Sequence, residues 1–519
     1  MNRVRKCSRN NCLVVFGIII LALVGFNICY SQNYNSSYFA FLEMEYLSFQ
    51  PPHEQIIRRK PGETRYDEVL TNSMILESKI HSLPCLKHRH YPDAQVSNKT
   101  YFSKSRRIND SMTQPLYEYN HMFLPLYSSS YSISDSLLSK ITGRGRGYSD
   151  SEAYAVKYIG VFRVSSHNNC WGPLGIGLPK LYRNYLGLAL MDEHLNVIPE
   201  SDIVIDVNEA YPFKRNTQRF EDCQLILPWF KDTVKNEEQL FLLCNAYFLP
   251  VNIIRNHPEI KSSKNKSFLQ NLYGKGLSVE LPSRKVVSIA NTDYKNMHII
   301  QSNGKAYLEL FPTQPHTTKE IDISLPLNFP KTDLIVSATE DPSPPLNETR
   351  IFRNMRARGT ACCLPLQSER FGDILVGIAH DKSIVSSFAF SYLSHFYAFK
   401  PSPPFEILAK SDNFCFPWPN DEIEGIENQP FAGKNYDDDL ELVSGKIKRV
   451  VHKNLKLFRN SFNCPRISFP TGITEKVGDE NVAWISIGMN DCYPQTLAIE
   501  KTKIDQLLYD IKDLKLTVN

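Results

Sequence analysis

The chain carries almost no excess charge for its length. Its 519 residues include 59 Lys and Arg against 55 Asp and Glu, which gives a formal net charge of +4. Proteins that bind nucleic acid usually present a strongly basic face. The composition therefore gives no reason to expect a nucleic-acid partner.

The chain also lacks the usual motifs for metals and nucleotides. No C-x-x-C pair or His/Cys cluster has the spacing of zinc ligands, so no metal site is predicted. The run GRGRG at 143–147 is not the G-x-G-x-x-G of a phosphate-binding loop, and no βαβ pattern surrounds it. The run NYDDDLEL at 435–442 contains a D-x-D of the kind that holds Mn²⁺ and a diphosphate. It lacks an α/β context as well, so we interpret it as a solvated acidic loop.

Long hydrophobic runs are absent except at the N-terminus. Residues 1–11 form a basic tail without an acid, and residues 12–30 contain no charge, which is long enough to cross a hydrocarbon core of about 30 Å as a helix. The next charged residues are acidic, so the positive-inside rule places the tail in the cytosol and the bulk of the chain in the lumen. We predict an uncleaved transmembrane signal-anchor. A cleaved signal peptide is the alternative, although FNICYSQ is a poor cleavage site.

Glycosylation sequons agree with exposure to the lumen. Five N-x-S/T triplets lack proline, at Asn35, Asn98, Asn109, Asn265 and Asn347. Nine cysteines follow the predicted anchor, and some of them should pair in an oxidising lumen, but the sequence leaves their connectivity open. The prediction is a single-pass type II protein of the Golgi or ER membrane.

The luminal part divides into two regions that differ in composition and hydrophobic pattern. Residues 31–150 are polar and weakly periodic, and we predict a luminal stem or irregular region. Residues 151–519 contain many short apolar runs bounded by Pro, Gly, Asn and Asp, typical of antiparallel strands, with one helix candidate at KIDQLLYDIKDLKL. An all-β fold of this size is expected to close on itself as a β-propeller or a large sandwich. Cys362 and Cys363 are expected to pack or to form separate disulfides, because neighbouring strand residues point to opposite faces.

Several runs of residues 154–508 follow one another in a characteristic order. They are GVFRV with YLGLALMDEHLNVI, RFEDCQLI with QLFLLCNAY, RGTACCLPL with GDILVGIAHDKS, HFYAFKPSPPFEILAKSDNF, and ISFPTGITEKVGDENVAWISIGMNDCYPQTLAIEKTKIDQLL. In this order they resemble the five-bladed β-propeller of glycoside hydrolase family 130, the mannoside phosphorylases, and related β-mannosyltransferases. The similarity covers about 154–508. It implies a five-bladed propeller that binds a nucleotide sugar, such as GDP-mannose, and a glycan acceptor, with no further cofactor.

The resemblance also implies the site residues. Asp222 matches the family's proton donor, and the substrate-binding candidates are Arg163, Glu221, Arg358, His380, Lys382 and Asp491. Cys223 and Gln224 stand where the family has Pro and Arg, so one cation of a phosphate site is missing there. Arg358 or Lys382 are the candidates to replace its charge.

Each candidate also has a structural interpretation. Glu221-Asp222 fits a turn, Arg163 fits an ion pair with an acid on a neighbouring strand, and His380 fits a hydrogen-bonded core histidine. Asp491 fits a β-turn in MND. We predict a glycosyltransferase that uses a mannosyl donor. The alternatives are a β-mannoside hydrolase or phosphorylase and a non-catalytic glycan-binding propeller.

Overall fold

The computed structural model describes the strands of the chain and some of their connections. The described residues are 74–86, 117–128, 133–165, 184–206, 222–226, 240–244, 247–257, 269, 271–280, 287–288, 296–312, 316–321, 335–340, 358–384, 390–417, 467–489 and 493–511. Within these ranges no helix is long and apolar enough to cross a membrane. The predicted tail and anchor (1–30) and all five sequons lie outside them.

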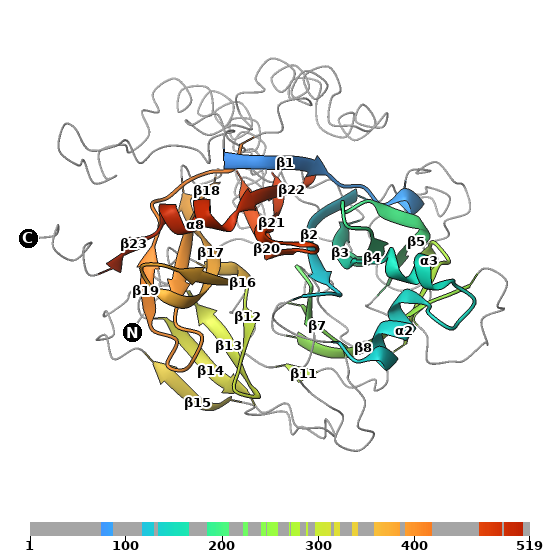
Figure 1. Ribbon diagram of the computed structural model, residues 1–519, viewed down its shortest axis with the longest axis horizontal. Coiled ribbons are helices and arrows are strands. Elements are labelled where there is room, and N and C mark those ends of the chain that lie inside the picture. Colours follow the sequence, from blue (N-terminus) through green and yellow to red (C-terminus); the bar gives the residue numbers. More distant parts are fainter. Residues whose placement is uncertain are drawn as a thin grey trace, which may run out of the picture. The chain divides into compact units, whose positions relative to one another are not determined.

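Five antiparallel sheets make up the described fold (Figure 1). The first contains β2 (Tyr117–Pro125), β3 (Tyr158–Ser165), β4 (Asn184–Met191), β5 (Val197–Ile205) and β9 (Asn271–Tyr273). The second contains β6 (Gln224–Ile226), β7 (Leu240–Cys244), β8 (Tyr247–Arg255), β10 (Leu277–Glu280) and β11 (Val287–Ser288). The third contains β12 (His298–Ser302), β13 (Lys305–Phe311), β14 (Thr317–Ile321) and β15 (Ile335–Glu340).

The other two sheets combine segments that are far apart in the sequence. The fourth contains β16 (Arg358–Ser368), β17 (Gly372–Ile384), β18 (Phe390–Phe399), β19 (Ile407–Lys410) and β23 (Tyr509–Asp510). The fifth contains β20 (Ser468–Lys476), β21 (Asp479–Met489), β22 (Tyr493–Glu500) and β1 (Ile75–Ile80). Since β1 pairs with β22, a strand from the N-terminal part completes a sheet built from the C-terminal part.

The first strands of the five sheets form a closed ring. Strand β2 packs against both β6 and β20, and β16 packs against both β12 and β20. The remaining neighbours, β6 and β12, are joined by a contact of 3.5 Å between Gln224 Nε2 and His298 Nε2. This arrangement confirms the predicted all-β fold with five blades.

Burial in the sheets explains why many strand sequences are apolar throughout. Every residue of β3 and of β4 is buried, although a strand with one solvated face would alternate apolar and polar residues. In this propeller both faces of an inner strand pack against neighbouring sheets. The core clusters accordingly combine side chains of adjacent sheets.

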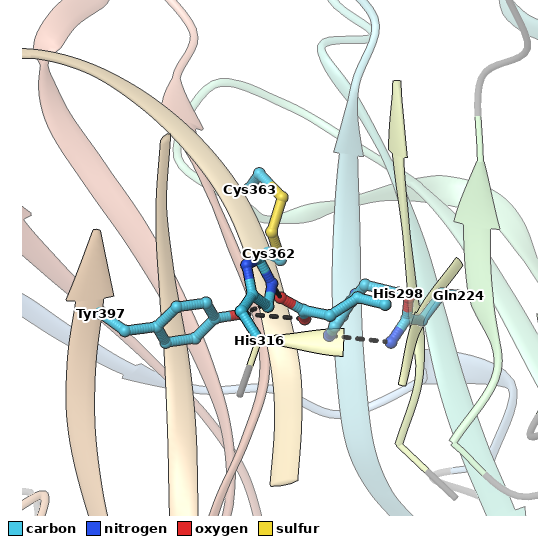
Figure 2. The surroundings of a disulfide bond; sticks show 7 residues. Gln224, His298, His316, Cys362, Cys363 and Tyr397 are labelled. Atoms are coloured by element: carbon cyan, nitrogen blue, oxygen red, sulfur yellow. Dashed lines mark hydrogen bonds and ion pairs between the residues drawn. A yellow bond between two sulfur atoms is a disulfide. The ribbon is translucent and has the colours of Figure 1, made fainter. Parts of the chain in front are cut away.

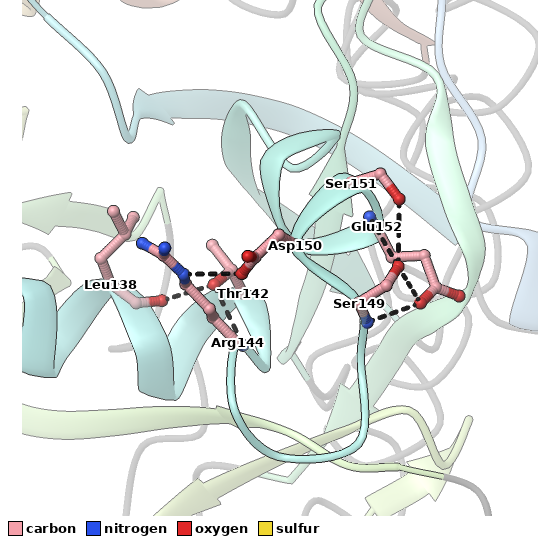
Figure 3. A network of polar contacts seen from close by, with 7 residues as sticks. All are labelled: Leu138, Thr142, Arg144, Ser149, Asp150, Ser151 and Glu152. Carbon is pink, nitrogen blue, oxygen red and sulfur yellow. Dashed lines mark hydrogen bonds and ion pairs between the residues drawn. The ribbon is translucent and has the colours of Figure 1, made fainter.

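The structure differs from the prediction for the segment 31–150. That segment contributes β1 and β2, and also α2 (Asp135–Thr142) and the first residue of α3 (Asp150–Tyr154). The GRGRG run begins at the left-handed Gly143 that ends α2, and the loop is held by an Arg144–Asp150 ion pair of 2.9 Å and a capping box between Ser149 and Glu152 (Figure 3).

The helix predicted near the C-terminus is shorter than expected. Helix α8 spans Lys501–Leu507 and is followed by β23, which pairs with β19. Ile504 and Leu508 are buried against the fourth and fifth sheets. Leu508, the first residue after the helix, therefore packs in the core, and the chain then continues into β23.

Candidate active site

A recess opens where the inner strands of four sheets meet. Its lining comes from β2, from β20, and from the residues at or just before β6 and β12, with one residue of β7. The lining residues are Asn120, His121, Met122, Asp222, Cys223, Gln224, Leu243, Asn296, Met297, Phe469 and Thr471. Among the residues that the structure describes, no group of three or more His, Cys, Asp or Glu could hold a metal ion.

Three of the lining residues have a backbone conformation that side chains rarely adopt. The φ angles are 40° at Asn120, 52° at Asp222 and 63° at Asn296. Asn120 also lies at a register shift between β2 and β3, which is a bulge. Left-handed backbone at non-glycine residues and bulges both gather at functional sites, where they direct a side chain to a particular place. Here they direct an amide and a carboxylate into the same recess.

Asp222 is held by two donors from the first sheet. Asn120 Nδ2 donates to Asp222 Oδ1 at 2.8 Å, and Arg163 Nη1 donates to the same oxygen at 3.2 Å. The ion pair is largely buried, with side-chain exposures of 8% for Arg163 and 16% for Asp222. Both contacts use Oδ1, so neither of them occupies Oδ2.

Arg163 is fixed in turn by its own surroundings. Its Nε donates to Asn184 Oδ1 at 3.1 Å, and its guanidinium lies 4.8 Å from the centre of the Tyr119 ring. The sequence left open whether this arginine has a ligand anion or a protein acid as its partner. The structure brings it to Asp222, a protein acid, so the two predicted residues belong to one pair.

The disulfide Cys223–Cys244 ties the segment of Asp222 to β7. Its sulfur atoms are 2.08 Å apart, and it joins the residue after Asp222 to the last residue of β7. The resemblance expected proline at position 223. The bond therefore provides a restraint on the backbone at the place where the family was expected to use a proline ring.

Removal of this disulfide is expected to destabilise the fold. For the double variant Cys223→Ala/Cys244→Ala, we expect the free energy of unfolding to fall by about 2–4 kcal/mol, because the unfolded chain is no longer constrained. Chemical denaturation measures the change. Cys85→Ala, which removes a free cysteine, is the control. An unchanged midpoint for the double variant would show that the bond does not restrain the fold.

Gln224 occupies the position where the resemblance expected an arginine. It is buried and meets His298 of β12 at 3.5 Å, as Figure 2 shows. At this point the chain therefore offers an amide and an imidazole in place of the arginine that the resemblance implies.

His380 lies beside the recess but does not line it. Its ring centre is 5.1 Å from that of Phe469, which does line the recess, and it stacks on Tyr392 at 5.0 Å. The next residue, Asp381, points to the opposite face of β17. Its carboxylate lies 3.5 Å from the ring of His395 on β18. Burial lowers the pKa of His395, and this carboxylate opposes that shift.

The remaining predicted residues are placed only in part. The backbone of Arg358 pairs with His380 across β16 and β17, and Lys382 pairs with Tyr392 across β17 and β18. Their side chains lie outside the described part of the chain, and so do Glu221 and Asp491. The roles of these four residues stay predictions.

The prediction for Cys362 and Cys363 was wrong. These neighbours form a disulfide with each other, and the peptide bond between them is cis (Figure 2). The prediction assumed regular alternation along the strand. The β16–β17 pairing instead shifts register on both sides of Ala361, so the alternation of faces does not hold at this point.

Asn120 and His121 are among the residues of the recess that sequence reasoning missed. They are 5% and 1% exposed, and neither Asn120 Oδ1 nor His121 Nδ1 has a hydrogen-bond partner among the residues that the structure describes. Both belong to YEYNHMFLP, which the prediction assigned to an irregular region. Its two polar residues between aromatic and apolar ones were the available signal for a strand with a functional bulge.

The chemistry available in the recess suits a polyhydroxylated ligand. Asp222 supplies a carboxylate, Asn120 and Gln224 supply amides, and His121 supplies an imidazole. Such groups can orient hydroxyls by hydrogen bonds, and a positioned carboxylate can accept or return a proton. The aromatic ring of Phe469 and the side chains of Met122 and Met297 provide apolar surface.

Comparisons with known proteins found similarity only to solved structures. No family model and no curated protein matches the chain. A glycosyl hydrolase from Bacteroides ovatus has 11% identity and a TM-score of 0.34, over 77% of this chain and 85% of that one. A GDP-Man-dependent mannosyltransferase from Leishmania mexicana has 12% identity and a TM-score of 0.31, over 74% and 85%. A mannose phosphorylase from Leishmania mexicana, in complex with phosphate ion, has 11% identity and a TM-score of 0.30, over 76% and 88%.

Proposed function

We propose that this protein is a glycosyltransferase that moves a mannosyl residue from a nucleotide sugar, such as GDP-mannose, to a glycan acceptor. The observation that carries the proposal is the carboxylate of Asp222, which lines a recess at the inner strands and is held by Asn120 and Arg163. Glycosyl transfer with inversion needs a base for the attacking hydroxyl or an acid for the leaving oxygen. The ordered sequence resemblance to mannoside-handling propellers supports mannose as the sugar.

In this proposal each candidate has a separate role. Asp222 exchanges the proton, and Arg163 keeps its carboxylate in place. Asn120 and Gln224 bind sugar hydroxyls. We assign His380, Arg358 and Lys382 to the donor phosphates, and Glu221 and Asp491 to the sugar.

The cellular setting of the proposal rests on the sequence. The basic tail, the uncharged run 12–30 and the five sequons support a single-pass type II protein with its propeller in the lumen of the Golgi or ER. Such a position would give the enzyme access to glycans of the secretory pathway.

Phosphorolysis of a β-mannoside is the second candidate reaction, and one observation argues against it. Gln224 and His298 occupy the place where the resemblance expects a phosphate-binding arginine. The amide of Gln224 cannot make the charge-assisted hydrogen bonds to an inorganic phosphate that a guanidinium makes. Transfer from a nucleotide sugar, in which the phosphate is part of the donor, is compatible with that replacement.

A direct assay separates these reactions. The full chain is incubated with GDP-mannose and a mannan-type glycan acceptor, and separately with mannobiose, with and without inorganic phosphate. We expect mannosylated acceptor and no phosphate-dependent cleavage of mannobiose. Turnover of mannobiose alone would contradict transfer, and turnover of neither substrate would favour a non-catalytic propeller.

A further inference from the structure

Two buried histidines share one threonine hydroxyl next to the recess. His121 Nε2 lies 2.7 Å from Thr496 Oγ1, and His81 Nε2 lies 2.8 Å from the same oxygen. Thr496 is on β22, His121 is on the inner strand β2, and His81 directly follows the closing strand β1. The cluster therefore connects the end of β1, the strand that completes the fifth sheet, to a residue that lines the recess.

The rings themselves are fixed by packing. The His121 ring stacks on Phe162 at 5.6 Å with an interplanar angle of 16°, and its centre is 4.9 Å from that of Phe123. His81 also packs against Phe123, at 5.1 Å, and Thr496 is completely buried. With the rings held in place, the variable that remains is which nitrogen of each ring carries the proton.

The hydroxyl couples the proton positions of the two rings. A threonine hydroxyl has one proton to donate, and it can accept further hydrogen bonds. If it donates to His121 Nε2, then His81 Nε2 must donate to it, and His121 carries its own proton on Nδ1. If it donates to His81 Nε2, then His121 Nε2 donates to it, and His121 Nδ1 is a bare acceptor.

Burial keeps both rings neutral, so each ring carries one proton, as the coupling requires. Desolvation, together with the neighbouring Lys79, lowers the pKa of His81 to about 3. Desolvation and the proximity of His81 lower the pKa of His121 well below its ordinary value. The other charged groups that line the recess or hold its lining are Asp222 and its partner Arg163.

We propose that His121 Nδ1 binds a hydroxyl of the sugar, and that Thr496 and His81 are positioning residues that set whether this nitrogen donates or accepts. Two independent observations support it: the Nδ1 atom is buried with no partner in the described part of the chain, and His121 is one of the residues that line the recess. The inference rests on the proposed function for the nature of the ligand. The tautomer coupling does not depend on the ligand and can be tested alone.

The tautomer test uses imidazole ¹⁵N spectra of the full chain, with His121 assigned from a His121→Gln variant. In His81→Phe the hydroxyl can donate only to His121, so we expect His121 entirely in the form protonated on Nδ1. In Thr496→Val the coupling is lost, and we expect a mixture of tautomers, whereas Thr496→Ser should match the wild type. Thr318→Val, a buried threonine of the third sheet, is the control.

The binding test titrates the same variants with mannobiose. We expect Thr496→Val to bind about tenfold more weakly, the effect of one mismatched hydrogen bond, and Thr496→Ser and Thr318→Val to bind normally. If Thr496→Val does not fold, the tautomer of His121 in His81→Phe tests the coupling instead.

Unchanged spectra in Thr496→Val or His81→Phe overturn the inference, as does unchanged binding in Thr496→Val. Absence of any sugar binding by the wild type would instead contradict the proposed function, and the spectra would still decide the coupling.

Discussion

Asp222→Asn is expected to lower the kcat/KM of mannosyl transfer by about 10²- to 10⁴-fold, the usual contribution of a positioned acid or base. The amide keeps the size of the carboxylate and an oxygen that can accept from Asn120 and Arg163, but it cannot take up the proton of an attacking hydroxyl. Initial rates with GDP-mannose and acceptor measure the effect. The KM for the donor should change much less than kcat, because the substitution removes chemistry and leaves most of the recess unchanged.

The control must remove a carboxylate without touching the recess. Asp479→Asn serves this purpose, because Asp479 is the first residue of β21, at the other end of β20 from Phe469 and Thr471. Its carboxylate accepts a hydrogen bond from the backbone N–H of Asn481 in the same strand. We expect normal rates for Asp479→Asn. Equal rates for Asp222→Asn and wild type would remove Asp222 from the mechanism and would favour a glycan-binding propeller.

The all-β class was predictable because its information is local, whereas the choice of five blades over a large sandwich came from the resemblance. Short apolar runs with turn residues between them indicate antiparallel strands, and a chain with this many strands must protect their edges, which a closed ring achieves. The local sequence also indicated that Asp222 precedes a buried strand. The lone Arg163 within an apolar strand also signalled a buried anionic partner, as the ion pair of 3.2 Å now shows.

The rest of the site depends on contacts that no local pattern encodes. His121 and Thr496 are 375 positions apart, and His81 and Thr496 are 415 apart. They meet because β1 completes the fifth sheet by pairing with β22, and because β2 packs against that sheet. A sequence shows neither which distant strand fills a sheet edge nor which bulge directs a side chain inward. The strand β2 was overlooked because its polar residues resemble those of the polar segment that precedes it.

The buried histidine pair predicts a strong dependence of stability on acid. The pKa of His81 is about 3 in the folded protein, against an ordinary value of 6.5, and that of His121 is lowered as well. A group whose pKa is lowered by folding contributes stability that is present above its unfolded pKa and is lost as the pH falls toward its folded pKa. As the pH is lowered from 6.5 to about 4.5, we expect His81 alone to lower the free energy of unfolding by about 2.5 kcal/mol. Each pH unit in this range changes that free energy by about 1.4 kcal/mol. His121 acts in the same direction.

Comparison of variants separates this effect from the protonation of carboxylates elsewhere. His81→Gln loses the threonine contact and should be less stable than the wild type at neutral pH, but it has one proton fewer to take up on unfolding. Its disadvantage in urea denaturation should therefore shrink as the pH is lowered, by about 1.4 kcal/mol per unit below the ordinary histidine pKa. His194→Gln, in the exposed turn between β4 and β5, is the control for the loss of an exposed imidazole. Parallel curves for His81→Gln and wild type would mean that folding does not lower the pKa of His81. That result would remove the burial argument for a neutral histidine pair, on which the coupling of His121 to Thr496 depends.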